Sequence, residues 1–375
     1  MNAFILAGGR GTRLEPLTLT RPKPLVPLVD RPILDNILRH LQSGGFDHIV
    51  MLVGFKGSEI AQYAGTGGAW GVNLQYHYEP EPLGTAGSLI DALAQHPMHE
   101  AFLVVSGDGL TNLNLSAFYQ ACQKAHAEVG ILLARVDDPR RFGVVKTNKS
   151  GHVTGFVEKP QKPGPNAWVN TGIYYFEPRV LQRLPLGQPL DFGFDLFPRW
   201  VAEGHCMIGV KSEGYWSDVG TLVEYRRAIA DILAGRIEIP TTPNPKITVS
   251  NSGFKAMPPV FIDELATIEP GAIVGPFTVI GSRTYVGRGA KVEASIVREK
   301  TWIGAGAQIS GVVVGEGSYI GTGAILDEGV VMGDHSWVGA ATHVASGTHI
   351  APDTVLVANP ARGASAASPQ KALAN

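Results

Sequence analysis

The chain has 375 residues, of which 44% are hydrophobic, so it is long enough to bury two separate hydrophobic cores. Its formal net charge of −2 at pH 7, with no dense run of Lys or Arg, argues against a nucleic-acid-binding surface. No stretch reaches the roughly 18 apolar residues that a membrane helix needs, and the first apolar run is too short for a signal peptide. Cys122 and Cys206 have no partners at metal-binding spacing, so we expect buried thiols in a reducing compartment. Together these observations predict a cytoplasmic protein with no nucleic-acid or membrane partner.

The first predicted element is a buried strand over residues 3–7, which breaks at once into two glycines. A glycine-rich turn after a strand lets backbone N–H groups converge on an anion, and Arg13 and Lys23 would add the positive charge that a polyphosphate needs. The Walker spacing G-x-x-x-x-G-K-[ST] is absent, and the dinucleotide fingerprint fails because Leu14 stands in place of its third glycine. A purely structural turn would leave the cations unexplained, so we predict a phosphate-binding turn.

Apolar runs and helical patterns then alternate as far as about residue 230. The periodicity predicts an amphipathic helix over 33–41, a helix over 88–94, and buried strands over 49–53 and 101–105. This βαβα order predicts an α/β domain whose parallel sheet carries helices on both faces. Ligands of such sheets bind beyond the carboxyl ends of the strands, which is where the glycine turn lies.

A proline-stiffened loop over residues 79–87, Glu-Pro-Glu-Pro-Leu-Gly-Thr-Ala-Gly, opens the helix of residues 88–94. Acidic residues are favoured at a helix N-terminus, which is one explanation of the two glutamates. A carboxylate can also accept the paired N1–H and N2–H₂ donors of guanine, whereas uracil and thymine offer one donor between two acceptors. Glu81, or alternatively Glu79, is therefore a candidate for guanine recognition, and backbone groups are an alternative reader of the base.

Asp108 follows the strand over 101–105 and lies between two glycines. Aspartate at such a place commonly caps a turn. Beside a phosphate-binding turn it is better explained as a Mg²⁺ ligand, because Mg²⁺ prefers one or two carboxylates together with phosphate oxygens and water. A second carboxylate, Asp218, lies in Gly-Tyr-Trp-Ser-Asp-Val-Gly-Thr over residues 214–221. The sequence by itself does not show that these two distant acids are neighbours.

Three short motifs lie between the two aspartates: Arg-Phe-Gly-Val-Val over 141–145, Phe-Val-Glu-Lys-Pro over 156–160 and Val-Asn-Thr-Gly-Ile-Tyr over 169–174. The glycine of the first motif would let a ligand approach the strand backbone. In a regular strand Glu158 and Lys159 would point to opposite faces. Lysine and proline together would also suit an edge strand.

From residue 9 to residue 24 the chain reads G-x-G-T-R-x-x-P-L-T-x-x-x-P-K-P. This pattern resembles the signature of sugar-nucleotide pyrophosphorylases, the NTP-transferases that couple a sugar 1-phosphate to a nucleoside triphosphate. The later motifs follow in that family's order, and the loop over 79–87 is most similar to its mannose-1-phosphate guanylyltransferase branch. The resemblance implies a Rossmann-like α/β nucleotidyltransferase domain over 1–231 with a mixed, mostly parallel sheet, and Mg²⁺ as cofactor on Asp108 and Asp218.

The resemblance also assigns roles to single residues. Arg13 and Lys23 would stabilise the leaving pyrophosphate, Lys159 would orient the incoming phosphate, and Asp108 completes the predicted catalytic set. The predicted nucleotide-binding residues are Leu6, Ala7, Gly8, Gly9, Gly11, Thr12, Arg13, Glu81, Gly84 and Thr85. The predicted sugar-phosphate-binding residues are Gly143, Glu158, Lys159, Asn170 and Thr171.

The implied reaction converts an NTP and a hexose 1-phosphate into an NDP-sugar and pyrophosphate, with GTP and mannose 1-phosphate as the favoured pair. Alternatives within the same chemistry are glucose 1-phosphate with UTP, dTTP or ATP, and a heptose 1-phosphate with GTP. A non-catalytic regulatory subunit is the remaining alternative, and the presence of every matched site residue argues against it.

Composition changes over residues 232–266, where prolines with Thr, Asn and Ser predict a linker or docking segment. A six-residue repeat of apolar residues follows, which is the mark of a hexapeptide β-helix with three hexads per coil. Its members are Ile268, Val274, Ile280, Val286, Val292, Ile303, Ile309, Ile320, Leu326, Met332, Val338, Val344 and Ile350. We predict a parallel β-helix over 267–358, left-handed by resemblance to hexapeptide-repeat proteins, with one-residue deletions near 293–302 and 310–319 and a disordered tail over 359–375.

Hexapeptide-repeat domains serve as acyltransferases or as assembly and spacer domains. An acetyltransferase needs a catalytic histidine, and His335, His343 and His349 are the candidates in the late hexads. Each falls at a solvent-facing position, and no long insertion breaks these hexads to build an acyl-donor pocket. We therefore expect the β-helix to mediate homo-oligomerisation rather than a second activity.

Overall fold

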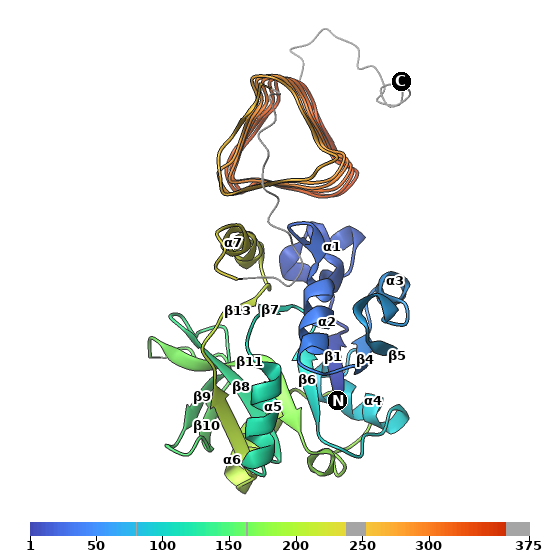
Figure 1. The fold of residues 1–375 in the computed structure, drawn as a ribbon, viewed down its shortest axis with the longest axis vertical. Helices are drawn as coiled ribbons and strands as arrows, with labels where there is room; N and C mark the ends of the chain where they lie inside the picture. The colour runs from blue at the N-terminus through green and yellow to red at the C-terminus, as the bar shows by residue number, and fades with distance from the viewer. Residues whose placement is uncertain (80, 163, 238–252, 358–375) are drawn as a thin grey trace. The chain divides into compact units, whose positions relative to one another are not determined.

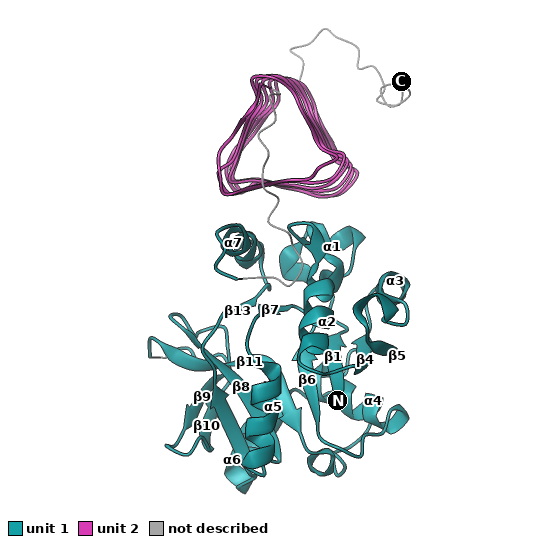
Figure 2. Ribbon diagram, viewed as in Figure 1, with its two compact units in different colours: residues 1–245 teal, residues 246–375 magenta. Residues whose placement is uncertain are grey.

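The computed structural model describes residues 1–79, 81–162, 164–237 and 253–357. Two compact units are present, residues 1–245 and residues 246–375 (Figure 2). Each unit has its own hydrophobic core, one around the aromatic residues of the first unit and one along the axis of the second.

A nine-stranded mixed sheet forms the centre of the first unit (Figure 1). Its main path runs β10-β9-β11-β6-β1-β4-β5, and β8 pairs with both β11 and β12. The strands are β1 (Asn2–Ala7), β4 (His48–Val53), β5 (Asn73–Tyr78), β6 (Phe102–Ser106), β8 (Val129–Val136), β9 (Val144–Thr147), β10 (Val153–Val157), β11 (Ala167–Phe176) and β12 (Met207–Lys211). Because β1, β4, β5 and β6 are parallel and β11 is antiparallel to β6, the predicted Rossmann-like, mostly parallel mixed sheet is confirmed.

The helices of the first unit follow the predicted alternation. They are α1 (Leu17–Thr20), α2 (Ile33–Ser43), α3 (Gly57–Ala64), α4 (Gly84–Gln95), α5 (Leu115–Lys124), α6 (Phe197–Glu203) and α7 (Leu222–Leu233), with 3₁₀ turns η1 (Thr12–Leu14), η2 (Lys23–Leu25), η3 (Gly68–Trp70) and η4 (Pro178–Val180) and a π-helical turn η5 (Phe192–Leu196). Helix α4 begins four residues before the predicted 88–94. Gly84 takes a left-handed φ of 72°, and the amides of Ala86 and Gly87 donate to the carbonyl of Leu190, so the helix starts against another segment.

Two short antiparallel strand pairs complete the first unit: β2 (Pro27–Leu28) with β3 (Arg31–Pro32), and β7 (Gly109–Thr111) with β13 (Trp216–Asp218). In the second pair Asp218 stands opposite Gly109, one residue beyond Asp108. A backbone hydrogen bond from the Val219 amide to the Asp108 carbonyl, 3.2 Å, continues the same contact. The pairing of β7 with β13 thus brings the two distant acidic motifs together.

The second unit is a parallel β-helix built from three six-stranded sheets, and its coils are triangular in cross-section (Figure 1). One sheet holds β14 (Lys255–Ala256), β17 (Ile273–Val274), β20 (Lys291–Glu293), β23 (Gln308–Ser310), β26 (Ile325–Leu326) and β29 (His343–Val344). The next holds β15 (Val260–Ile262), β18 (Thr278–Ile280), β21 (Ile296–Val297), β24 (Val313–Val314), β27 (Val331–Met332) and β30 (His349–Ile350), and the third holds β16 (Thr267–Ile268), β19 (Tyr285–Val286), β22 (Trp302–Ile303), β25 (Tyr319–Ile320), β28 (Trp337–Val338) and β31 (Val355–Leu356). The predicted hexapeptide β-helix is confirmed.

The phase slips in the hexapeptide pattern are one-residue deletions, as predicted. Val292 is followed by an inward-facing residue at Val297, and Ile309 by one at Val314, each five positions later instead of six. Two coils therefore contain 17 residues, as when Tyr285 pairs with Trp302, while others contain 18. The inward ladder of Val, Ile, Leu and Met side chains remains continuous through both deletions.

The predicted linker over 232–266 is wrong at its C-terminal end, and its N-terminal end differs by two residues. Helix α7 extends to Leu233, and the β-helix already begins at β14, where Lys255 pairs with Ile273. Strand β15 pairs with β18 in the same way, and Pro258 and Pro259 lie at the corner between β14 and β15. Prolines are tolerated at such corners because the backbone there donates no ladder hydrogen bond, so they do not mark the end of the regular structure. The predicted tail over 359–375 lies outside the described residues.

Candidate active site

The glycine turn after β1 forms the wall of a cavity of about 200 Å³. Gly11 adopts a left-handed φ of 67°, and a Cβ on Gly107 would lie 2.6 Å from the Leu6 carbonyl oxygen, so both positions require glycine. The cavity is lined by six of the predicted nucleotide-binding residues, Leu6, Ala7, Gly9, Gly11, Thr12 and Arg13, together with Lys23, Pro24, Gly107 and Asp108. The structure therefore gathers most of the predicted phosphate-binding turn around one hollow.

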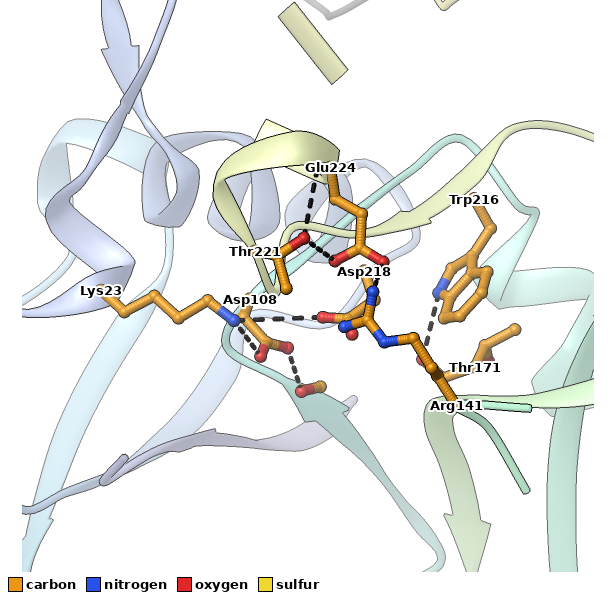
Figure 3. Close-up of polar contacts among 9 residues, drawn as sticks. Lys23, Asp108, Arg141, Thr171, Trp216, Asp218, Thr221 and Glu224 are labelled. Carbon is orange, nitrogen blue, oxygen red and sulfur yellow. Dashed lines mark hydrogen bonds and ion pairs between the residues drawn. The ribbon is translucent and has the colours of Figure 1, made fainter. Parts of the chain in front are cut away.

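Lys23 lines this cavity, and its ammonium group contacts both acidic motifs (Figure 3). Its Nζ is 2.5 Å from Asp108 Oδ2 and 3.9 Å from Asp218 Oδ1, and only 7% of the residue is exposed. The hydroxyl of Ser106 donates to the other oxygen of Asp108 at 2.5 Å. Both carboxylates thus face one ammonium group, although they come from strands β6–β7 and β13.

The pKa values of the two carboxyl groups are shifted in opposite directions. Burial alone would raise the pKa of Asp108, but the Lys23 ammonium and the Ser106 hydroxyl hold that pKa below its ordinary value. Burial and the negative charge of Asp108 raise the pKa of Asp218 to about 6. The pair therefore carries at least one permanent negative charge that is compensated by a cation.

These residues suit the predicted Mg²⁺ ion. No group of three or more His, Cys, Asp or Glu side chains suited to a metal occurs in the part of the chain that the structure describes. Two carboxylates are the usual protein contribution to a Mg²⁺ site whose other ligands are substrate phosphates and water. Asp108 and Asp218 provide such a pair, and a cation, the Lys23 ammonium, already lies against both of them.

A second cavity, of about 320 Å³, opens beside the first and holds the predicted sugar-phosphate residues. All five of them line it: Gly143, Glu158, Lys159, Asn170 and Thr171. Arg13 and Asp108 line both cavities, and Asp218 lines the second. The two hollows therefore meet at Arg13 and Asp108, beside the Lys23 ammonium.

Glu158 and Lys159 do not point to opposite faces. Strand β10 ends at Val157, and Lys159 has a left-handed φ of 44°, so the alternation of a regular strand has stopped before these residues. Lys159 Nζ lies 3.5 Å from Glu158 Oε1 and 5.2 Å from the centre of the Phe194 ring. The expectation from strand geometry was wrong, and both charges border the same cavity. Strand β10 is nevertheless an edge strand, as the Lys-Pro pair suggested.

Glycines make room for the Glu158 carboxylate. A Cβ on Gly143 would lie 2.6 Å from Glu158 Oε2 and would overlap the Phe156 ring, and a Cβ on Gly193 would lie 2.5 Å from the same oxygen. Burial raises the pKa of Glu158, while the Lys159 ammonium lowers it. Gly143 therefore shapes the second cavity by admitting this carboxylate.

Asn170 and Thr171 sit at a break in strand β11, where its pairing with β8 shifts register. The Asn170 side chain donates to the Tyr174 hydroxyl at 2.9 Å and accepts from the Gly172 amide at 2.9 Å. The Thr171 hydroxyl is buried and donates to the Leu132 carbonyl at 2.8 Å. These bonds fix the shape of the cavity wall, and the Thr171 hydroxyl is already satisfied within the protein.

The three predicted nucleotide-binding residues of the loop over 79–87 lie away from the first cavity. Glu81 is exposed, whereas Glu79 is half-buried, with Oε2 2.7 Å from where a Cβ of Gly8 would be. Burial raises the pKa of Glu79. Gly84 abuts the Leu190 backbone, and the Thr85 hydroxyl donates to Asp191 at 2.9 Å beside the sugar cavity. Of the two glutamates considered from the sequence, Glu79 is the one at the glycine turn.

Three residues at the second cavity were not singled out from the sequence: Arg141, Asp191 and Trp216. Asp191 begins η5, accepting from the amides of Gly193 and Phe194, and so joins this turn to Thr85. The Trp216 indole donates to the Thr171 carbonyl at 3.1 Å. One sequence signal was available near this site: the spacing Thr-x-x-Glu from Thr221 to Glu224 predicts the capped start of a helix just after Asp218, which is where α7 begins.

Profiles of known families match both units. The profile of the Nucleotidyl transferase family matches residues 2–235, and that of the GMPPB C-terminal domain matches residues 256–362. A mannose-1-phosphate guanylyltransferase of Mycobacterium tuberculosis is 32% identical over 298 residues, which cover 79% of this chain and 79% of the relative. A UTP–glucose-1-phosphate uridylyltransferase of Synechocystis sp. is 32% identical over 323 residues, which cover 80% of this chain and 83% of the relative.

Solved structures resemble the chain over a smaller part of its length. A putative glucose-1-phosphate thymidylyltransferase from Bacillus anthracis, in complex with a sucrose, matches with a TM-score of 0.57 and 26% identity over 64% of this chain and 98% of that one. HddC from Yersinia pseudotuberculosis, complexed with GMP-PN, matches with a TM-score of 0.54 and 25% identity over 62% of this chain and 99% of that one. None of the described helices is long and apolar enough to cross a membrane. From the glycine turn, the paired acidic motifs and a profile match over more than half of its length, the chain is a member of the Nucleotidyl transferase family.

Proposed function

We propose that this protein transfers a nucleotidyl group from an NTP to the phosphate of a sugar 1-phosphate and releases pyrophosphate. The observation that carries the proposal is the meeting of two cavities at Arg13 and Asp108, beside the Lys23 ammonium. One cavity is bounded by the glycine turn and suits phosphates, and the other is bounded by polar side chains and suits a sugar. The named activities of the relatives from Mycobacterium tuberculosis and Synechocystis sp. support the same reaction class.

In this reaction an oxygen of the sugar phosphate attacks the α-phosphorus of the NTP, and the bond from that phosphorus to the pyrophosphate breaks. Because the substrate supplies the nucleophile, the protein contributes positioning and charge compensation rather than a Ser or Cys nucleophile. Lys23 and Arg13, at the glycine turn, compensate the charge of the departing pyrophosphate. Lys159 orients the incoming phosphate. Mg²⁺ held by Asp108 and Asp218 would add charge neutralisation on the phosphates.

Within this class we propose GTP and mannose 1-phosphate as the substrates. The Glu79 carboxylate at the glycine turn offers two acceptor oxygens, which match the two neighbouring donors on the guanine edge. The match of residues 256–362 to the GMPPB C-terminal domain and the mannose-1-phosphate guanylyltransferase relatives support the same choice. UTP with glucose 1-phosphate is the second candidate, because a uridylyltransferase is equally identical over a similar length.

We also propose that the chain assembles with copies of itself through the β-helix. The support is a set of stacked aromatic pairs on the sheet that runs from β16 to β31, Tyr285 with Trp302 and Tyr319 with Trp337, at ring distances of 3.9 and 3.7 Å. Trp302 is 45% exposed and the other three rings are partly exposed, and a contiguous apolar surface of this kind favours association. An acyltransferase role has no such support: the coils between β16 and β31 advance by 17 or 18 residues without an insertion, and His343 pairs with Asp327 at 2.8 Å.

The deciding experiment is a grid of pyrophosphate-release assays with the purified full-length protein and Mg²⁺. GTP, ATP, UTP and dTTP are each combined with mannose 1-phosphate and glucose 1-phosphate. We expect release with GTP and mannose 1-phosphate, and loss of about three orders of magnitude in kcat/KM for Asp108→Asn, because charge compensation at the phosphates is removed. Asp138→Asn, on an exposed acid away from both cavities, is the control.

Each result has a distinct meaning. Release with UTP or dTTP and glucose 1-phosphate would retain the reaction class and reject the guanine assignment. Silence across the grid would contradict the proposed activity for these substrates, and near-normal turnover by Asp108→Asn would reject its role at the metal.

A further inference from the structure

Arg141 is a cation of the second cavity, which we call the sugar cavity, and it has no role in the reaction proposed above. It lines that cavity together with Lys159, and 41% of its side chain is exposed. The guanidinium forms an ion pair with Glu224 at the start of α7, close to Asp218 (Figure 3). No second ion pair of Arg141 occurs within the described parts of the chain. Arg141 therefore lines the cavity with a single acid as its ion-pair partner.

The neighbouring arginine shows what an ordinary surface pair looks like here. Arg140 turns back onto Asp138, two residues earlier, with Nη2 2.6 Å from Oδ2, and both side chains are more than half exposed. Arg140 does not line either cavity, whereas Arg141 reaches across to an acid 83 residues later in the chain. The two adjacent arginines thus have different surroundings, and Arg140 is a natural control for Arg141.

Glu224 is held in place independently of Arg141. Thr221 caps α7: its hydroxyl accepts from the Glu224 amide at 3.3 Å and donates to Glu224 Oε2 at 2.9 Å. The Thr221 hydroxyl thus caps the helix and also holds the Glu224 carboxylate at the first turn. If the guanidinium changed partner, Glu224 would keep its hydrogen bond to Thr221. Ion pairs with solvent access contribute little to stability, so replacing Glu224 by another anion as the partner of Arg141 would cost little free energy.

The charge of the cavity makes such an exchange useful. Asp108 and Asp218 line the cavity and Glu224 lies close to Asp218 (Figure 3), so these carboxyl groups would repel an incoming phosphate. Arg141 compensates Glu224 before the substrate enters. A guanidinium also presents parallel N–H donors that bind two phosphate oxygens at once, which a lysine ammonium does not.

We propose that Arg141 binds the phosphate group of the sugar 1-phosphate, and that Glu224 is its counter-ion in the empty site. This inference rests on the proposed function. Arg141 and Lys159 would then hold the attacking phosphate from two sides, and the Arg141–Glu224 pair makes the site selective for a phosphorylated sugar over the free sugar.

The test compares steady-state kinetics of the full-length wild type, Arg141→Gln, Arg141→Lys and Glu224→Gln, with Arg140→Gln as the matched control. We expect Arg141→Gln to raise KM for the sugar 1-phosphate about tenfold or more, with KM for the NTP within about twofold of the wild type. Arg141→Lys should give an intermediate KM because a point charge replaces a two-pronged donor. Glu224→Gln, which retains the capping hydrogen bond, should lower that KM because the competing charge is gone. Arg140→Gln should match the wild type.

A second readout separates phosphate binding from a structural role. The unphosphorylated sugar, used as a competitive inhibitor, should have the same inhibition constant in the wild type and in Arg141→Gln. An unchanged KM for the sugar 1-phosphate in Arg141→Gln would overturn the inference while wild-type turnover upheld the proposed function. Equal losses for the NTP, the sugar 1-phosphate and the free sugar would overturn it as well. If the wild type itself turned over no sugar 1-phosphate, the proposed function would fail and this inference with it.

Discussion

At the scale of single residues, the site depends on a few paired charges, two of which join distant parts of the chain. Lys23 compensates Asp108 and Asp218, Lys159 lies against Glu158, and Arg141 pairs with Glu224. Each of these cations thus has an acid within 4 Å before any substrate is bound. Anionic substrates can replace those acids without leaving a cation buried and unpaired, which would be costly.

Glu79 provides the sharpest test at this scale, since the neighbouring Glu81 is a matched control. Glu79 is half-buried against Gly8, and Glu81 is exposed two residues later. We expect Glu79→Gln to raise KM for GTP about tenfold, because one acceptor of the guanine edge becomes a donor, while Glu81→Gln leaves KM for GTP unchanged. Pyrophosphate release at varied GTP measures both. A large effect of Glu81→Gln with none of Glu79→Gln would reverse the assignment.

At the scale of elements, the site is built where short segments meet, and its supports are local. The pairing of β7 with β13 brings Asp218 to Asp108, and the cap of α7 positions Glu224. Because β10 ends before Glu158, the side chains of Glu158 and Lys159 both border the same cavity. Helix α2 packs close to this framework. His40 on α2 donates from Nε2 to the Leu113 carbonyl at 2.8 Å, just beyond the β7 segment.

His40 predicts a pH dependence of stability. Burial lowers the pKa of His40 below 6.5, and the Leu113 hydrogen bond only partly offsets this. The unfolded chain therefore binds a proton at pH values where folded His40 stays neutral, so the contribution is present above pH 6.5 and is lost as pH falls toward the lowered pKa. We expect the loss of Tm between pH 7.5 and pH 5.5 to be smaller in His40→Gln, whose amide can donate to the same carbonyl. Calorimetry at several pH values would measure it, and an equal loss in both proteins would contradict the assignment.

At the scale of the whole molecule, two units with separate cores serve different purposes. The residues that we propose as catalytic all lie in the first unit, and the second unit is a regular β-helix whose inward ladder is uninterrupted from β14 to β31. A β-helix of this kind offers flat lateral faces rather than a pocket, which suits contacts between chains.

The assembly proposal predicts a molar mass above that of one chain, 39.9 kDa. Multi-angle light scattering of the full-length protein would measure it. We expect Trp302→Lys to shift the mass toward one chain, because it places a charge in the stacked aromatic row. Ile325→Lys, on the sheet that contains β26, is the control, since it changes a comparably exposed residue on another face. A wild-type mass of one chain would reject the assembly proposal, and dissociation by Ile325→Lys alone would place the contact elsewhere.

Features that depend on the spacing of nearby residues could be predicted from the sequence alone. The glycine turn and its cations, the alternation of strands and helices, and the hexapeptide ladder with both one-residue deletions depend on local spacing, because backbone geometry and periodic burial act over a few residues at a time. The prolines near residue 258 led to a wrong prediction of where the β-helix begins, because composition does not distinguish a linker from a β-helix corner.

The identity of neighbouring groups from distant parts of the chain became known from the packing of the elements. This packing brought Asp218 to Asp108 through the pairing of β13 with β7, turned Lys159 toward Glu158, selected Glu79 over Glu81 at the glycine turn, and paired Arg141 with Glu224. These contacts join segments whose separation in sequence carries no information about distance, or depend on where a strand ends. Charge compensation falls off steeply with distance, so the chemistry of the site was fixed by this packing and not by the motifs alone.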